Sequence, residues 1–238
     1  MNLWEMLLQW IYPPHCIFCQ KLLKIGKETM LCMDCENTFQ YNDGAVCQKC
    51  GRPMYISQKY CDRCQNTNFV FERGIAAFSY DMVKEGIAHF KLKGFKRDAK
   101  PFGELMGDYL LTYYTEIAQQ SDLLIPVPMY EKKQKKRGFN QSELLAEELS
   151  KRIQKKCSIK NLKRIRQTVP QSRLSAKERK ENVKNAFVLE NEEEIRQKTI
   201  LLIDDIFTTG STMDECAKVL YKNGAKKVFF FCLSIVEA

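Results

Sequence analysis

The chain has 238 residues, 45% of them hydrophobic and 28% charged, with 38 Lys and Arg against 29 Asp and Glu, a formal net charge of +9. This composition excludes a wholly disordered protein, and no apolar run approaches the roughly 20 residues that a membrane-spanning helix needs. The length suits one domain of moderate size and a small module.

The N-terminal segment MNLWEMLLQWIYPP is apolar but contains Glu5 and no Lys or Arg. Because Pro13 and Pro14 end it after about three turns, it predicts a short amphipathic helix and not a signal peptide. We therefore expect a cytoplasmic protein, in which disulfides are rare. A partner could still hold such a protein at the inner face of the membrane.

Eight of the eleven cysteines lie between residues 16 and 64, in four Cys-x-x-Cys pairs. Two intervening residues let both thiolates of a pair turn toward one metal ion, as in structural zinc sites. The alternatives are disulfides, which conflict with the missing signal peptide, and a redox pair, which does not explain four repeats. The pattern predicts two structural Zn²⁺ ions, with the ligands Cys16, Cys19, Cys32, Cys35, Cys47, Cys50, Cys61 and Cys64.

Two pairings of these cysteines are open. Sequential ribbons join neighbouring pairs and need only local closure, whereas a cross-brace interleaves them; local closure favours the ribbons. With every ligand a cysteine, no coordination position is left for catalysis. Residues 1–70 are thus predicted to form a helix and a double zinc ribbon that owes most of its folding energy to metal, and residues 71–238 to form a separate domain.

After residue 70, predicted strands and helices alternate. The strands are expected at residues 74–81, 122–128, 199–203 and 227–235, with weaker candidates at 162–166 and 186–189. The helices are expected at residues 83–92, 101–117 and 211–222 and from residue 140 onward. This alternation predicts an α/β fold, an open parallel sheet with helices on both faces.

The positive charge is concentrated in residues 131–190, which hold 18 Lys and Arg against 7 Asp and Glu. One cluster follows the strand at 122–128 and contains Lys132, Lys133, Lys135, Lys136 and Arg137. A second contains Arg164, Arg166, Gln171, Arg173, Lys177, Arg179 and Lys180. A solvated basic face is the better interpretation for the individual lysines. For Arg137, Gly138 and Asn140, expected in a tight turn, we favour a function.

A second specific motif follows the apolar run at 199–203. Asp204 and Asp205 end this strand, and a loop then leads into a helix through Thr208, Thr209, Gly210, Ser211 and Thr212. Small hydroxyl residues at a helix N-terminus bind phosphate through N–H groups, O–H groups and the helix dipole. Carboxylates suit sugar hydroxyls or a magnesium ion held through water. The motif predicts a sugar-phosphate site, since an ordinary capped helix would not explain the acid pair.

With this motif the chain resembles a type I phosphoribosyltransferase. The resemblance implies that Asp204 and Asp205 meet the ribose hydroxyls of phosphoribosyl pyrophosphate with Mg²⁺, and that residues 208–212 cradle its 5′-phosphate. It also implies a pyrophosphate-binding loop at Arg137 and Gly138, where Lys135, Lys136 and Asn140 are further candidates for contacts with pyrophosphate or DNA. The second basic cluster falls where such enzymes carry a lid.

The order of all these features is similar to the ComF family of competence proteins. It comprises the cysteine ribbons, residues 90–94 leading to 105–107, Pro-Val-Pro, Arg-Gly-Phe-Asn-Gln, Gln171-x-x-Leu174 with Arg179 and Asn182, and the acid-pair motif. This resemblance implies a role in DNA uptake and natural transformation, single-stranded DNA binding, and an ATP-driven helicase partner that the zinc ribbons could dock.

Two functions therefore remain open. The protein could be a DNA-uptake factor that keeps a phosphoribosyl pyrophosphate site, or a metabolic phosphoribosyltransferase that acts on an unidentified nitrogen acceptor without a direct DNA role. Charge does not separate them, because pyrophosphate and DNA phosphates attract the same cations. The absence of a Walker A sequence argues against an ATP-driven motor.

Overall fold

The computed structural model describes residue 10 and residues 13–26, 29–55, 58–92, 95–167 and 176–236. The predicted N-terminal helix lies outside the described residues, apart from residue 10 and the two prolines that end it. Gln171 and Arg173 of the predicted lid, Leu174 of the ComF motif and residues 93–94 also lie outside them, as do the side chains of Lys177 and Lys180.

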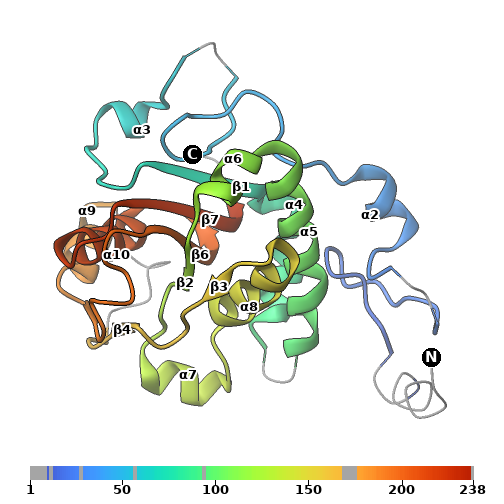
Figure 1. Cartoon of the computed structure of the whole chain (residues 1–238). Coiled ribbons are helices and arrows are strands. Elements are labelled where there is room, and N and C mark those ends of the chain that lie inside the picture. Colours follow the sequence, from blue (N-terminus) through green and yellow to red (C-terminus); the bar gives the residue numbers. More distant parts are fainter. Residues whose placement is uncertain are drawn as a thin grey trace.

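A five-stranded sheet forms the centre of the chain (Figure 1). Its strands are, in spatial order, β1 (Arg73–Ser79), β7 (Lys227–Ile235), β6 (Thr199–Phe207), β2 (Leu123–Pro126) and β3 (Lys156–Cys157). All neighbours are parallel, and central β6 pairs with β7 and β2. The predicted open parallel sheet is confirmed.

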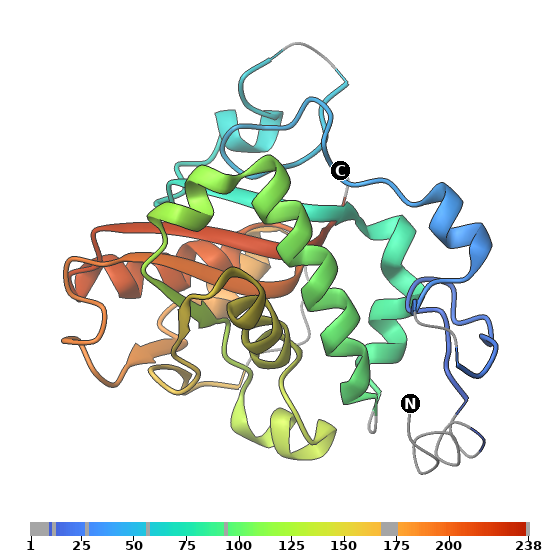
Figure 2. The ribbon, with the colours of Figure 1, turned by 45° about the vertical axis from the view of Figure 1, so that its right-hand side comes forward.

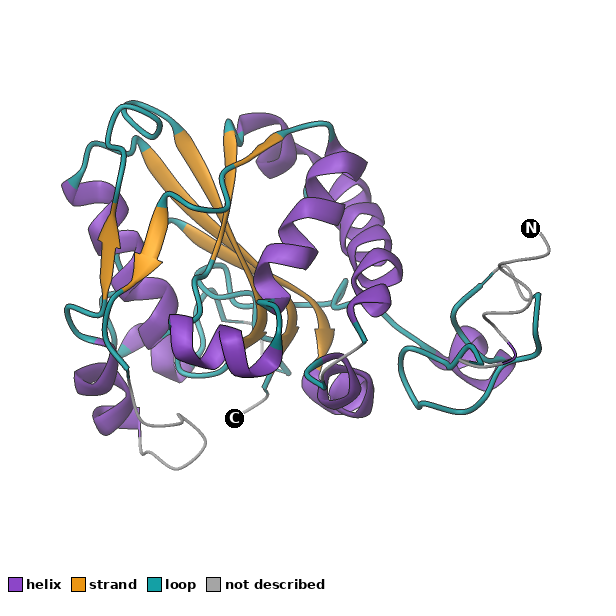
Figure 3. Cartoon of the chain, turned by 90° about the horizontal axis from the view of Figure 1, so that it is seen from below, coloured by secondary structure: helices purple, strands orange, loops and turns teal. Residues whose placement is uncertain are grey.

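Helices cover both faces of this sheet, as Figures 2 and 3 show from two sides. One face carries α4 (Tyr80–Phe90), α5 (Ala99–Tyr113) and α8 (Gln141–Ile153), and the other carries α9 (Ala176–Val183) and α10 (Ser211–Lys222). Successive side chains of β6 alternate between two cores: Leu201 and Ile203 pack with α5 and α8, whereas Ile200 and Leu202 pack with α10. This burial on both faces explains the continuous apolar run.

Several element boundaries differ from the sequence prediction. β6 continues through the acid pair to Phe207, because its pairing with β7 extends to Ile235. The helix expected at 101–117 is broken at Tyr114, whose φ is −139°, and α6 (Thr115–Gln120) follows. The two weaker strand candidates, β4 (Leu162–Arg164) and β5 (Phe187–Leu189), form a separate antiparallel pair.

The cysteine-rich segment forms two ribbons, each with a short helix. The first ribbon (residues 13–38) ends in α2 (Met33–Thr38), and the second ribbon (residues 45–65) ends in α3 (Asp62–Gln65). An antiparallel bridge closes each knuckle turn, His15 with Leu22 and Val46 with Pro53. The ribbons lie at different edges of the sheet domain, the first beside α4 and α5 and the second beside β1 (Figures 1 and 2).

Candidate functional site

The four cysteine pairs come together in sequential order. Cys16, Cys19, Cys32 and Cys35 form one cluster and Cys47, Cys50, Cys61 and Cys64 the other, with all sulfur atoms of a cluster within 4.8 Å of one another. Sγ of Cys19 lies 3.7 Å from Sγ of Cys32, and Sγ of Cys50 lies 3.7 Å from Sγ of Cys61. Tetrahedral Zn²⁺ with bonds of about 2.3 Å to sulfur requires this spacing. Both donor sets fit zinc, and the cross-brace alternative is wrong.

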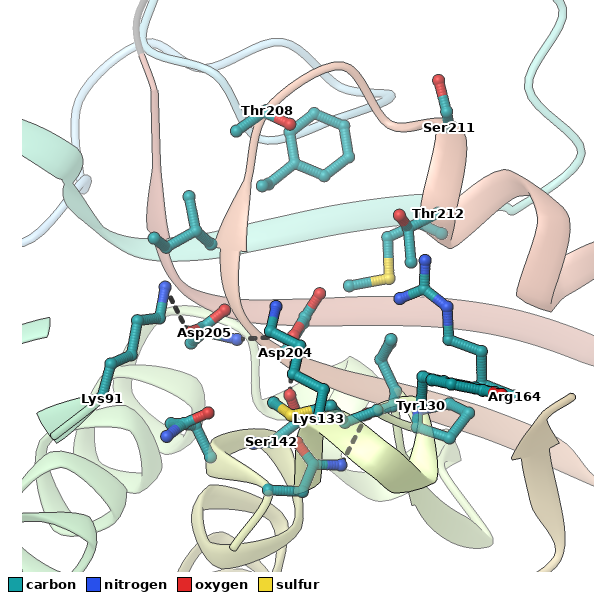
Figure 4. A pocket seen from close by; sticks show the side chains of 18 of the residues that line it. Lys91, Tyr130, Lys133, Ser142, Arg164, Asp204, Asp205, Thr208, Ser211 and Thr212 are labelled. Carbon is teal, nitrogen blue, oxygen red and sulfur yellow. Dashed lines mark hydrogen bonds and ion pairs between the residues drawn. The ribbon is translucent and has the colours of Figure 1, made fainter. Parts of the chain in front are cut away.

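A large pocket opens at the carboxyl ends of β6 and β2, where open parallel sheets bind ligands. Its volume is about 1310 Å³, above the roughly 300–1,000 Å³ of typical small-molecule sites. The acid pair, residues 208–212, the start of α8 and α7 (Glu131–Arg137) all line it (Figure 4). The structure therefore brings most of the predicted site residues into one cavity.

The two carboxylates of the acid pair have different partners. Asp204 accepts a 2.7 Å hydrogen bond from Oγ of Ser142, and Asp205 forms a 2.7 Å ion pair with Nζ of Lys91 (Figure 4). Burial, and then the negative charge of Asp205, raise the pKa of Asp204 to about 7. A carboxylate that is costly to ionise favours a cation or hydrogen-bond donors beside it, so this site is suited to Mg²⁺ or sugar hydroxyls.

Residues 208–212 form the predicted turn between β6 and α10. Gly210 caps α10 with a φ of +84°, and an added Cβ would lie 2.9 Å from the ring of Phe69. The hydroxyls of Thr209 and Ser211 lie 3.0 Å apart. Glycine is thus required both for the backbone conformation and for space. The turn presents hydroxyl groups and the N-terminus of a 12-residue helix to the pocket, a suitable arrangement for a phosphate.

The basic segment after β2 is a helix, α7, and not the loop that the resemblance implies. Lys132, Lys133, Lys136 and Arg137 line the pocket. Burial and then the charge of Arg137 lower the pKa of Lys133, and burial lowers that of Arg137. Lys135 does not line the pocket, because its Nζ forms a 2.5 Å ion pair with Glu131 on the exposed side of the helix.

Gly138 and Asn140 have structural roles in the turn between α7 and α8. Gly138 ends α7 with a φ of +93°, and it does not line the pocket. Asn140 borders the pocket but is buried; its Nδ2 donates to the carbonyl of Val127 over 3.0 Å and its Oδ1 accepts from the N–H of Ser142 over 3.2 Å. These bonds position Ser142, and hence Asp204.

The second basic cluster divides in the same way. Arg164 and Arg179 line the pocket, and the Arg164 side chain extends toward Thr212 in Figure 4. Arg166 instead donates to the carbonyls of Asn182 and Lys184 over 3.1 and 2.6 Å. At Arg164, which belongs to the cluster that the resemblance assigns to a lid, burial lowers the pKa of the guanidinium.

Several lining residues were not predicted as site residues. Lys91 and Ser142 meet the acid pair, and Arg52 and Arg63 enter the pocket from the second ribbon. Lys91 lies in the segment 90–94, which is part of the ComF resemblance, so the sequence did contain a signal for this residue. No sequence signal pointed to Arg52 or Arg63, because the spacing of zinc ligands does not indicate which ribbon contacts a loop far away in the sequence.

Two family models match the chain. A double zinc ribbon domain matches residues 7–65, and a phosphoribosyl transferase domain matches residues 139–234. In the described part of the chain, no helix is long and apolar enough to cross a membrane.

Similar proteins cover almost the whole chain. The DNA utilization protein YhgH of Escherichia coli O6:H1 is 33% identical over 93% of this chain and 96% of its own length. Competence protein F of Haemophilus influenzae is 31% identical over 90% and 93%. Among solved structures, a hypoxanthine phosphoribosyltransferase from Staphylococcus aureus is 17% identical over 61% of this chain and 69% of its own, with a TM-score of 0.38. With its double zinc ribbon and phosphoribosyl transferase domain, the chain belongs to the ComF family of competence and DNA-utilization proteins.

Proposed function

We propose that the pocket binds phosphoribosyl pyrophosphate with Mg²⁺. The observation that carries this proposal is that the acid pair, residues 208–212 and the cations of α7 all line one cavity. Asp204 and Asp205 would meet the ribose hydroxyls and the metal, and Thr208 to Thr212 the 5′-phosphate. Lys133 and Arg137 would meet the pyrophosphate.

In the cell, we propose that this domain serves DNA uptake and that the protein binds single-stranded DNA. Lys132 and Lys136 lie at the pocket on α7, and their neighbour Lys135 is exposed, so a DNA backbone could follow this helix past the site. The zinc ribbons would dock an ATP-driven helicase. The protein would act in the cytoplasm, and a partner could hold it at the inner face of the membrane.

Phosphoribosyl transfer is the second candidate. The pocket exceeds the size of typical small-molecule sites and so leaves room for an acceptor. In that reaction the bond from C1 of ribose to the pyrophosphate oxygen breaks, the electron pair leaves with pyrophosphate, and a nitrogen of the acceptor bonds C1 and loses its proton. Arg137 and Lys133 would stabilise the departing charge, and the acid pair would hold the ribose.

Titration calorimetry with magnesium phosphoribosyl pyrophosphate tests the site. We expect the wild-type protein to bind, and Asp204→Asn/Asp205→Asn to lose binding. Asp81→Asn/Asp108→Asn is the control, because it removes the same charge from two positions that do not line the pocket. No binding by the wild type, or equal binding by both variants, would rule out the proposed site.

Fluorescence anisotropy with a labelled single strand tests the DNA role. Lys132→Ala/Lys136→Ala should weaken binding and reduce its salt dependence by about two phosphate contacts. Binding that is undetectable at low salt would sink this role. Release of pyrophosphate in the presence of candidate nitrogen acceptors would favour the enzyme instead.

A further inference from the structure

We propose that the second ribbon is itself a wall of the phosphate site: Arg52 positions the loop of residues 208–212, and Arg63 contacts the bound phosphate group. The proposal deepens the proposed function, on which the ligand-binding part rests. Nothing in the double-ribbon pattern indicates it, since neither arginine is a zinc ligand.

Arg52 connects the second zinc cluster to the phosphate loop. It follows the Cys47–Cys50 knuckle and is only 6% exposed. Its Nη2 donates to the carbonyl of Thr208 over 3.1 Å, and its Nη1 donates to the carbonyl of Val236 beyond the end of β7. The guanidinium thereby joins the ends of two neighbouring strands. Because it bonds carbonyl oxygens, the Arg52 guanidinium occupies none of the N–H groups of the loop, and it adds a positive charge beside them.

The knuckle that carries Arg52 is fixed against β1. Gly51 has a φ of +74°, and an added Cβ would lie 2.7 Å from the carbonyl oxygen of Gly74. The N–H of Gly74 donates to the carbonyl of Lys49 over 2.8 Å, and the Lys49 ammonium donates to the carbonyl of Phe71. The position of Arg52 is thus set by backbone contacts and by the neighbouring zinc ligand Cys50.

The segment that leaves the second ribbon also supports the loop. The ring of Phe69 packs against Gly210, and the N–H of Val70 donates to Oδ1 of Asp214 in the first turn of α10 over 2.8 Å. Cys47 and Cys50 belong to the same buried cluster as Phe69 and Phe207. The second zinc cluster is therefore continuous with the core beneath the phosphate loop.

Arg63 supplies a charge that faces the cavity. It lies in α3 between the ligands Cys61 and Cys64, is partly buried, and lines the pocket. It makes no hydrogen bond or ion pair with any described residue. A cation at a cavity wall without a carboxylate partner suits an anionic ligand, and Thr208 and Ser211, which line the same cavity, suit a phosphate.

The first ribbon provides the contrast. None of its described residues lines the pocket, and it contacts α4, α5, η1 (Lys96–Asp98) and Phe78 of β1. Here too an arginine bonds a backbone carbonyl, since Nη2 of Arg97 donates to Pro13 over 3.1 Å. Arg97 can therefore serve as the control for Arg52, because it makes the same kind of bond to the first ribbon.

Hydrogen exchange of the ligand-free protein tests the positioning role of Arg52. Arg52→Met should speed exchange of the amides of residues 209–212 on the order of tenfold, with both zinc ions retained, because a charge-assisted hydrogen bond that holds the loop is lost. Arg52→Lys should restore part of the protection, and Arg97→Met should leave these amides unchanged. Unchanged exchange in Arg52→Met, or an equal change in Arg97→Met, would overturn this role.

Calorimetry with magnesium phosphoribosyl pyrophosphate and with inorganic phosphate tests Arg63. Arg63→Ala should weaken both ligands about fivefold and lower the salt dependence, Arg63→Lys should recover part of the loss, and the exposed Lys24→Ala on the first ribbon should have no effect. Equal affinities in Arg63→Ala and the wild type would overturn the contact. If the wild type binds neither ligand, the proposed function and the Arg63 contact both fail, while the exchange experiment still decides the role of Arg52.

Discussion

The two zinc ribbons share the same Cys-x-x-Cys spacing but contact different parts of the molecule. The first packs on α4, α5 and the end of β1: Phe18 lies against Phe102 and against Phe78 of β1, and the carbonyl of Ile17 approaches Gly86 of α4. The second packs on β1 and reaches the phosphate loop through Arg52. Identical metal sites can thus have unequal influence on a distant pocket. What differs is the residues that flank the ligands.

The largest contrast is expected on removing each zinc ion. Cys50→Ser/Cys61→Ser should unfold the second ribbon and weaken phosphoribosyl pyrophosphate binding on the order of 100-fold, because structural Zn²⁺ contributes apparent binding energies of about 10–16 kcal/mol to folding. Cys19→Ser/Cys32→Ser should lower stability but leave the affinity within about twofold of wild type. Zinc content and calorimetry measure both. Equal losses of affinity would contradict the distinction between the ribbons.

Two glycines allow each ribbon to be displaced with its zinc in place. An added Cβ at Gly86 would lie 1.7 Å from the carbonyl oxygen of Ile17, and one at Gly51 would lie 2.7 Å from that of Gly74. Gly86→Ala and Gly51→Ala should each cost about 2–4 kcal/mol in the free energy of unfolding, measured with denaturant. Only Gly51→Ala should also weaken phosphate binding. Weaker binding in Gly86→Ala would show that the first ribbon is coupled to the pocket as well.

The acid pair should give the pocket a pH dependence of its own, apart from the loss of zinc that protonation of the cysteine ligands causes in both ribbons at low pH. Because the pKa of Asp204 is raised to about 7 in the folded protein, ionisation there opposes folding. The destabilisation is absent below about pH 4, grows as the pH rises toward 7, and is constant above it. The stability of Asp204→Asn relative to wild type should therefore rise by about 4 kcal/mol from pH 4 to pH 8, as denaturant unfolding at both values would measure. A constant difference between the two proteins would contradict the raised pKa.

The smallest contrast lies within α7, on the wall opposite the second ribbon. Arg137 lines the pocket, whereas Lys135 faces away and pairs with Glu131. In calorimetry at low salt, Arg137→Ala should weaken the binding of phosphoribosyl pyrophosphate about tenfold, and Lys135→Ala should weaken it less than about twofold. Equal effects would mean that the whole helix acts through its net charge, and that the inward direction of Arg137 does not matter.

Local sequence patterns were enough to predict the two cysteine clusters, the sheet and the hydroxyl-rich turn of residues 208–212. Each of these depends on residues within about a dozen positions: the knuckle spacing, the buried run before Asp204, and the hydroxyl-rich turn before α10. α10 and β7 have the predicted boundaries, because both have clear apolar periodicity and clear ends. The sequential pairing of the cysteines also follows from local closure.

Tertiary structure decided which side chains face the pocket. Among neighbouring cations of one helix, Arg137 points inward and Lys135 outward, and Asn140 serves as a helix cap that positions Ser142. Lys91 reaches Asp205 across more than a hundred positions of sequence, and Arg52 reaches Thr208 across 156. Such contacts depend on how ribbons and helices pack around the sheet. Composition and spacing determine which groups are available to bind phosphate, but only the fold determines which of them meet in one pocket.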